Sequence, residues 1–314
     1  MNDIRYGRKR SGIKRELTNK VESWLDSIED DDVRWIAARN VIVTGGAIAS
    51  MLLGERINDY DVYFRTREAT LKVAEYYVKK FNEAHKLKSV NDYAPIVKGE
   101  KIFNIKGEEE DRVIIWMRSA GYAGEDQEDY NYFETLSERE TVEFAESLLK
   151  DEMEQGKEPE YRPVFMSQNA ITLSDKMQIV IRFYGQPEEI HDNYDFLHAT
   201  CYWDHWPGRL VFPAEAMECL LSRTLIYRGS LYPIASIFRA KKFVQRGWRI
   251  TAGQLLKIMW QISEIDLSDP KILREQLTGV DMAYMYELIQ ALKGVEAEKI
   301  NSTYIGAIID RIFE

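Results

Sequence analysis

VIVTGGAIASMLLGERINDYDVYF, residues 41–64, is the most informative stretch of this 314-residue sequence. Val41–Val43 forms a short apolar run that predicts a buried strand. Gly45 and Gly46 come next, and paired glycines allow a tight turn in which backbone N–H groups approach a ligand closely. Ala47–Leu53 predicts a short helix. The turn would therefore lie at a helix N-terminus, where a phosphate group is favoured.

The second half of the stretch alternates over Asn58–Phe64. A period of two predicts a strand that places Asp59 and Asp61 side by side on one face. The other face would carry Tyr60, Val62 and Phe64. Two converging carboxylates suit a hard cation such as Mg²⁺.

The order of these elements carries more weight than any one of them. A strand, a glycine pair, a short helix and an Asp-Tyr-Asp-Val strand follow one another, with twelve residues between Gly46 and Asp59. This arrangement resembles the signature of the DNA polymerase β-like nucleotidyltransferase superfamily, in which an hG[GS] turn precedes [DE]h[DE]h at a similar spacing. The resemblance implies an α+β fold with a nucleotidyltransferase-type mixed β-sheet core and flanking helices.

A third carboxylate of that superfamily lies in an h[DE]h pattern, which Tyr194-Asp195-Phe196 resembles. The triplet follows a strong buried-strand signal at Met177–Phe183. Asp192 is the alternative, but it lies in the preceding turn, so we favour Asp195. The chain between the second and third acids is much longer than in minimal members of the superfamily, which is a departure from the pattern.

The resemblance implies nucleotidyl transfer from an NTP to an acceptor hydroxyl, with release of pyrophosphate. Asp59 and Asp61 would hold the metal ion on the triphosphate, and Asp195 would join them around a second ion that activates the acceptor oxygen. Two Mg²⁺ ions, or Mn²⁺, are therefore the expected cofactors, with ATP or CTP as the nucleotide. Gly45 and Gly46 would present backbone N–H groups to the β- and γ-phosphates.

Further nucleotide contacts are expected outside the glycine turn. Ser50, on the helix after the turn, is either an additional donor or a packing residue. Arg239 and Lys242 are three residues apart and can share one helix face towards the phosphates. Lys241 and Arg246 would lie on a neighbouring face.

The net charge of −10 argues at first against nucleic-acid binding, but its distribution is uneven. Gly107–Glu160 holds 18 acidic and 5 basic residues, so the rest of the chain is weakly basic. Cys219–Ser263 has no acidic residue and eight basic ones: Arg223, Arg228, Arg239, Lys241, Lys242, Arg246, Arg249 and Lys257. A focused positive surface favours RNA or tRNA as the acceptor. A helical domain with a solvated basic face is the alternative interpretation.

Residues 227–248, YRGSLYPIASIFRAKKFVQRGW, also bear on the acceptor. They resemble, more loosely, the basic helices that line the nucleotide cleft of RNA-directed members such as CCA-adding enzymes. The sequence is also similar to what we expect of bacteriophage nucleotidyltransferase-like proteins. No aromatic RNA-binding motif is present. Nucleotidylation of a protein or small molecule, as by a toxin, and a non-catalytic protein that retains the fold both stay open.

The length predicts two domains. We expect a catalytic domain over residues 1–212, with a β-rich and acidic insertion at about 86–162, and an all-α C-terminal domain over 213–314. Expected strands in and after the insertion are Ala94–Val97, Ile102–Ile105, Val113–Trp116, Val164–Met166, Ala170–Leu173 and Met177–Phe183. Expected C-terminal helices are Ala214–Tyr227, Pro233–Arg246, Thr251–Ile265, Pro270–Leu277, Met282–Leu292 and Thr303–Phe313.

The N-terminal region begins with the basic segment Asn2–Lys20, which predicts a flexible arm. Helical spacing starts at Val21, and Asp30-Asp31-Asp32 is placed to cap a second helix that ends near Arg39. A long helix is expected from Thr70 to Phe81.

Three histidines, His191, His198 and His205, invite a zinc hypothesis. Their spacing of seven fits neither a strand face nor a compact metal loop, so we interpret them as packing residues or polar neighbours of the site. Cys201 and Cys219 offer no disulfide framework, which favours a reducing cytoplasm, that of the host for a viral protein. The sequence has neither an apolar run of membrane-spanning length nor a signal-peptide pattern.

Overall fold

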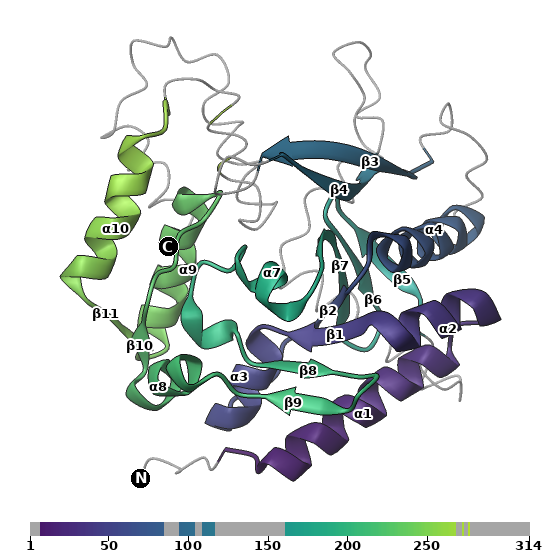
Figure 1. Ribbon diagram of the computed structural model, residues 1–314, viewed down its shortest axis with the longest axis horizontal. Coiled ribbons are helices and arrows are strands. Elements are labelled where there is room, and N and C mark those ends of the chain that lie inside the picture. Colours follow the sequence, from purple (N-terminus) through teal and green to yellow (C-terminus); the bar gives the residue numbers. More distant parts are fainter. Residues whose placement is uncertain are drawn as a thin grey trace.

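A computed structural model describes residues 7–84, 94–103, 109–116 and 161–267, together with Ile272 and Gln276. Its centre is a seven-stranded sheet in the order β5-β6-β7-β2-β1-β8-β9 (Figure 1). Neighbouring strands are antiparallel except β2 and β7, which are parallel. The strands are β1 (Val41–Thr44), β2 (Tyr60–Phe64), β5 (Pro163–Met166), β6 (Ala170–Leu173), β7 (Met177–Tyr184), β8 (Tyr202–Asp204) and β9 (Arg209–Val211). The prediction of a mixed-sheet α+β core is confirmed.

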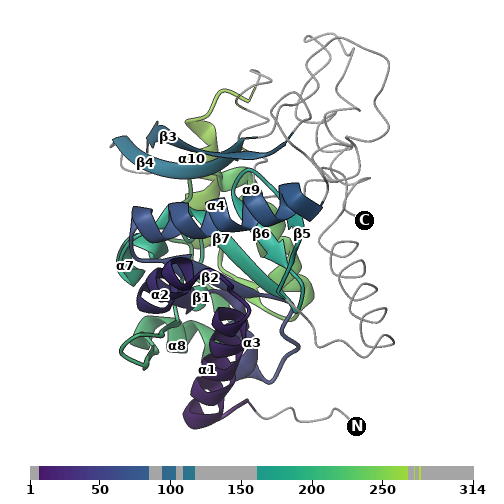
Figure 2. The ribbon, with the colours of Figure 1, turned by 90° about the vertical axis from the view of Figure 1, so that its right-hand side faces the viewer.

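Two groups of helices lie at different sides of the molecule. Helices α1 (Arg10–Asp26), α2 (Asp31–Asn40) and α4 (Arg67–Ala84) lie at one side and face the viewer in Figure 2. Helices α9 (Pro233–Gln245) and α10 (Ala252–Ser263) lie at the other side (Figure 1). No helix in the described part of the chain is both long and apolar enough to cross a membrane.

Helix α1 begins at Arg10, so the prediction of a flexible arm up to Lys20 was wrong. The apolar spacing that starts the helix extends upstream through Ile13 and Leu17, and both side chains are fully buried. The basic residues between them face outward. Because the prediction was based on the basic composition of the segment, it overlooked this apolar stripe. The next prediction is confirmed, because the Asp30 side chain accepts the N–H groups of Asp32 and Val33 at the start of α2.

The two faces of the sheet are separated by the pleat of β1 and β2. Val43 pairs with Val62 and points into the main hydrophobic core. Ile42 pairs with Tyr63, and both belong to a smaller cluster on the opposite face. Thr44 pairs with Asp61 and continues this second face to the end of β1.

The insertion contributes a separate two-stranded antiparallel ribbon, β3 (Ile96–Phe103) and β4 (Glu109–Trp116). The sequence predicted two strands where β3 is one. Gly99 lies between them and pairs with Val113, so the ladder continues through the glycine. Most of the acidic segment lies outside the described residues.

Residues 213–267, which belong to the described part of the chain, are mostly helical, and α9 and α10 match their expected bounds closely. The expectation of an all-α domain does not hold for these residues, because they also form two short strands. Helix α8 (Ala214–Ser222) is shorter than expected because Arg223 adopts a left-handed conformation with φ of 49°. The chain then forms β10 (Thr224–Leu225), which pairs with β11 (Arg249–Ile250). The helices expected at Met282–Leu292 and Thr303–Phe313 lie outside the described residues.

Candidate functional site

The glycine turn joins β1 to helix α3 (Gly46–Leu53), as the sequence predicted. Gly45 is the N-cap of α3, with φ of 93° and ψ of −150°, a conformation that essentially only glycine adopts. A Cβ atom at position 45 would lie 2.7 Å from Asp61 Oδ2 and 3.5 Å from the Tyr194 hydroxyl. Glycine is therefore required here both by backbone conformation and by the approach of the Asp61 carboxylate.

Strand β2 begins at Tyr60, so Asp61 lies on the strand and Asp59 directly precedes it. Tyr60 and Val62 belong to the main core on one face, whereas Tyr63 belongs to the smaller cluster on the other. Burial raises the pKa of Tyr63 most. The negative charge of Asp61 raises it further, and the charge of Asp59 adds to the effect. Both carboxylates are half-buried. The charges of Asp59 and Asp61 thus both act on the Tyr63 hydroxyl.

The backbone around the turn changes the role expected for Gly45. Its N–H donates to Ala199 O at 3.1 Å, so the residue anchors the turn. Gly46 is exposed and is the first residue of α3, where backbone N–H groups lack helical acceptors. Ser50 lies one turn further along and is half-buried.

Three site residues were missed by the sequence analysis: Thr44, Tyr63 and Tyr194. The Thr44 hydroxyl lies 2.8 Å from His191 Nε2 and donates to Cys201 O at 3.0 Å. Burial lowers the pKa of His191 to about 4, with a further contribution from Arg228. The alternation of side chains along β1 and β2 could have placed Thr44 and Tyr63 on the face of the site. No sequence signal identifies Tyr194 as a site residue.

Asp195 does not lie on a strand of the central sheet. It follows α7 (Pro187–His191) in a bend, and the next residue, Phe196, forms an isolated bridge with Tyr227. Its carboxylate accepts from Arg239 Nη1 at 2.7 Å. Asp195 is therefore tied to helix α9.

The structure does not assemble the expected cluster of three acids. Among the described residues, no group of three or more His, Cys, Asp or Glu side chains is placed to hold a metal ion. Asp192, the alternative to Asp195, lies at the end of α7 with its carboxylate 3.5 Å from Arg228 Nη2. Arg239 connects the two acidic regions, because it pairs with Asp195 and its charge also offsets part of the rise that burial and Asp61 cause in the pKa of Tyr63.

Several basic residues in the acid-free stretch are paired with acids from elsewhere in the chain. The pairs are Arg223 with Glu55 at 3.1 Å, Arg228 with Asp192 and Arg239 with Asp195. The sequence stretch alone therefore overstates the positive surface. Lys241, Lys242 and Arg246 are exposed, and Arg246 lies with its guanidinium 5.9 Å from the centre of the Phe243 ring.

The histidines behave as packing residues and polar neighbours. His191 contacts Thr44. His198 is buried among Phe243 and Trp248, with ring centres 4.4 and 4.5 Å away, and His205 packs on Trp203.

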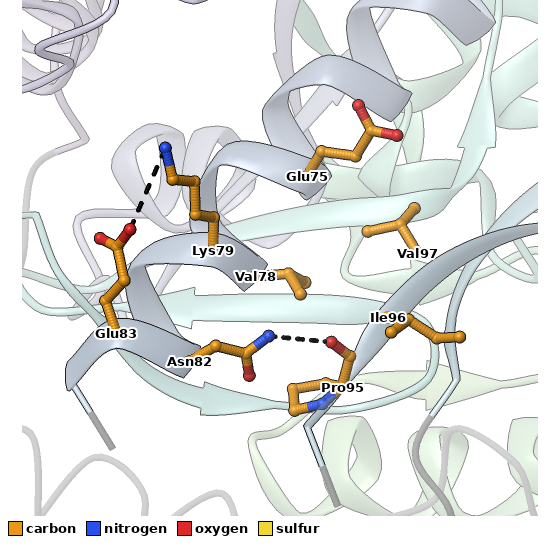
Figure 3. Close-up of a pocket in the computed structure, with 8 residues that line it drawn as sticks. All are labelled: Glu75, Val78, Lys79, Asn82, Glu83, Pro95, Ile96 and Val97. Carbon is orange, nitrogen blue, oxygen red and sulfur yellow. Dashed lines mark hydrogen bonds and ion pairs between the residues drawn. The ribbon is translucent and has the colours of Figure 1, made fainter. Parts of the chain in front are cut away.

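A separate hollow of about 370 Å³ lies between α4 and β3 (Figure 3). Asn82 closes one end by donating to Pro95 O at 3.1 Å, and Lys79 lies 4.0 Å from Glu83. Neither the glycine turn nor the acids of β2 line it, so it is not part of the candidate site.

A family model decides the relationship of the chain to known proteins. The model of Gad2, described as "Gabija anti-defense 2 family protein", matches residues 15–223, more than half of the chain. The chain belongs to this family. The matched Gad2 region includes the glycine turn, β2 and Asp195 and ends before α9.

Two solved structures are also similar to this Gad2 family member. The Thermotoga maritima CCA-adding enzyme complexed with tRNA is 14% identical, with a TM-score of 0.37, and the match covers 93% of this chain and 53% of that one. A CCA-adding enzyme in complex with CTP gives 14% identity, a TM-score of 0.36 and coverages of 93% and 54%. The chain thus spans about half the length of these enzymes, and the scores are too low to carry an argument. A search of curated proteins finds no match.

Proposed function

We propose that this protein transfers a nucleoside monophosphate from an NTP to an acceptor hydroxyl. The observation that supports this most is the contact between the glycine turn and Asp61. A helix N-terminus favours phosphate, and a carboxylate pair favours the cation that accompanies a triphosphate. A Cβ atom at Gly45 would lie 2.7 Å from Asp61 Oδ2, so the N-terminus of α3 and the Asp61 carboxylate are adjacent. Transfer of a nucleotide needs both at the same place.

The described residues fit one Mg²⁺ ion better than two. Mg²⁺ is commonly held by one or two carboxylates together with substrate phosphates, and Asp59 and Asp61 supply such a pair. The ion would neutralise charge on the triphosphate and its leaving group. A second ion that also uses Asp195 would require Arg239 to leave that carboxylate. The two-ion form of the proposal therefore includes this exchange of partners.

The protein's own groups have defined parts in this proposal. The N–H groups of the first turn of α3, starting at Gly46, would bind phosphate oxygens. Arg239 would stabilise negative charge beside Asp61, since its charge already acts on Tyr63. Lys241, Lys242 and Arg246 extend the positive charge along the end of α9. Ser50 is one helical turn from Gly46 and would be an additional donor.

RNA, including tRNA, is the first acceptor class in this proposal. The support is the exposed basic end of α9, because Lys and Arg bind the phosphates of a longer chain. A protein acceptor is the second candidate. It is favoured by the pairing of Arg223, Arg228 and Arg239 with acids, which removes charge from the surface offered to RNA. For this candidate we propose a component of the Gabija defence as the target, following the family description.

A labelling experiment separates these acceptors. The protein is incubated with each α-labelled NTP and Mg²⁺, once with total RNA and once with purified Gabija proteins. Label in RNA supports the first acceptor, and label in a Gabija protein supports the second. Asp59→Asn with Asp61→Asn should abolish labelling, and Asp192→Asn is the matched control with an acid removed outside the pair. Absence of label in every combination would contradict nucleotidyl transfer.

A further inference from the structure

The outer face of helix α2 carries an unusual stripe of exposed residues: Asp32, Trp35 and Arg39. Their spacing of three and four residues places them on one face of the helix. Asp32 and Arg39 are about 10 Å apart along the axis, with Trp35 close to the midpoint. The helix lies on the surface that faces the viewer in Figure 2. The stripe is therefore accessible, with a negative end, an aromatic centre and a positive end.

Arg39 contacts two tryptophans that are far apart in the sequence. Its guanidinium carbon lies 4.8 Å from the centre of the Trp35 ring and 4.6 Å from that of Trp206, which is in the turn between β8 and β9. These distances are those of cation–π contacts, which involve the charge of the guanidinium and do not use its N–H groups as hydrogen-bond donors to a carboxylate. Within the described part of the chain, Arg39 has no carboxylate partner. Its N–H donors are thus available to a carboxylate from outside.

Asp32 is the complementary group at the other end of the stripe. Its neighbours are already engaged, since Asp30 caps α2 and Asp31 pairs with Arg34. The side chain of Asp32 makes no ion pair with any described residue. Trp35 and Trp206 are 60% and 57% exposed, which is high for such large apolar side chains. Tryptophan is enriched among the residues that carry most of the binding energy in protein interfaces.

We propose that this stripe is a self-association surface, whose partner is α2 of a second copy of the chain. An antiparallel pair of α2 helices, related by a two-fold axis near Trp35, would bring Asp32 of each copy to the Arg39 guanidinium of the other. The same operation brings the tryptophans of the two copies together at the centre. A two-fold interface requires such a self-complementary surface.

The charges favour a second copy over a nucleic acid. Asp31 and Asp32 lie at one end of the stripe, and a phosphate chain laid along α2 would meet them. The exposed apolar residues of α10, including Met259 and Trp260, form a different face. That face lacks a charge pattern that indicates its partner.

The surface is well separated from the candidate nucleotide site. Helix α2 ends at Asn40, directly before β1, whereas Gly45 follows the other end of β1. Strand β8 runs antiparallel to β1, with Thr44 opposite Tyr202 and Ile42 opposite Asp204. Trp206 therefore lies beyond the end of β1 at which α2 stops. Association through α2 would leave the glycine turn of both copies open.

The interface should be weak. A standard stable interface buries roughly 800 Å² on each partner, and one short helix with an adjacent turn offers less. We therefore expect a monomer–dimer equilibrium in the micromolar range rather than an obligate dimer. Its strength should depend on salt, because exposed ion pairs are screened.

Sedimentation velocity from about 1 to 200 μM tests the proposal, with chain concentration as the variable. Wild type should show a rising dimer fraction. Arg39→Glu and Asp32→Arg should each weaken association at least tenfold, because like charges then face each other across the axis. An equimolar mixture of the two variants should regain association, since each ion pair is restored with reversed or original polarity. Trp260→Ala is the matched control and should behave as wild type.

The mixture distinguishes a real interface from damage to the helix. Both substituted residues are exposed, and thermal melting checks that each variant folds. A wild type that stays monomeric throughout the range would overturn the proposal. So would a dimer that persists in both single variants, or one that is lost in Trp260→Ala.

Discussion

The Asp61 carboxylate approaches Gly45 so closely that no other residue type fits at position 45. The Asp61 Oδ2 atom occupies the space 2.7 Å from where a Cβ atom would be, and the φ of 93° is unfavourable for any side chain. This relationship joins the N-terminus of α3 to the acidic strand β2. Five further consequences of the structure can be measured.

Gly45→Ala should destabilise the protein by at least about 1–3 kcal/mol, the usual cost of a strained backbone conformation. It should also displace Asp61 and weaken nucleotide binding. Chemical denaturation and calorimetry measure the two effects. Gly12→Ala is the matched control, because a Cβ at that position of α1 meets no atom within 4 Å. It should be neutral or stabilising by up to about 1 kcal/mol. An unaltered Asp61 and unchanged stability in Gly45→Ala would contradict the geometry.

The Asp195–Arg239 ion pair should couple α9 to the loop after α7. A double-mutant cycle with Asp195→Asn and Arg239→Gln should give a coupling free energy of about 0.5–1 kcal/mol, kept small because Arg239 is 40% exposed. The Arg8–Glu16 pair, which is exposed on both sides, is the comparison and should couple less. Strict additivity at Asp195 and Arg239 would show that the contact has no energetic weight.

His198 should make stability fall in mild acid. Burial lowers the pKa of His198 from an ordinary value near 6.5 to about 4. The unfolded chain therefore binds a proton that the folded chain resists. The free energy of unfolding therefore begins to fall as the pH drops below about 6.5, and the total loss reaches about 3 kcal/mol near pH 4.

His198→Phe tests this assignment within the same aromatic surroundings of Phe243 and Trp248. Urea denaturation at pH 7 and pH 5 should show a smaller pH dependence in the variant than in wild type. Burial also lowers the pKa of His191 to about 4, so the difference between the two proteins is the informative quantity. Identical pH dependence would remove His198 from the account.

The basic end of α9 should set the salt dependence of RNA binding. Each phosphate contact contributes roughly one logarithmic unit to the salt slope. Charge reversal at Lys241 and Arg246 should therefore flatten the slope by about two units and leave Mg²⁺–NTP binding largely intact. Lys257→Glu, on α10, is the control for a general change in charge. RNA affinity that is absent at low salt, or equal in the α9 variant, would favour a protein acceptor.

Local patterns predicted the core of the fold well. The strand, glycine turn, short helix and second strand of residues 41–64 appear as predicted, because each depends on short-range periodicity and turn chemistry. The early start of α1 was predictable too, since Ile13 and Leu17 continue the stripe of Val21. The helix start was predicted too late because the basic composition of the segment was given more weight than this apolar spacing.

Long-range pairing was beyond the sequence. The h[DE]h pattern at Asp195 gave no sign that Phe196 would bridge Tyr227 or that Arg239 would take the carboxylate. The stretch with no acids likewise hid the pairing of Arg223 with Glu55, more than 160 residues away in the chain. Such contacts depend on how the elements pack, which periodicity does not encode.

The most direct test of the nucleotide site is isothermal titration of the protein with each NTP in the presence and absence of Mg²⁺. At least one NTP should bind at submillimolar concentration in a Mg²⁺-dependent manner. Asp59→Asn combined with Asp61→Asn should remove the Mg²⁺ dependence, whereas Asp192→Asn should keep it. Absence of binding for all four NTPs at millimolar concentration, in a protein shown to be folded, would contradict the account.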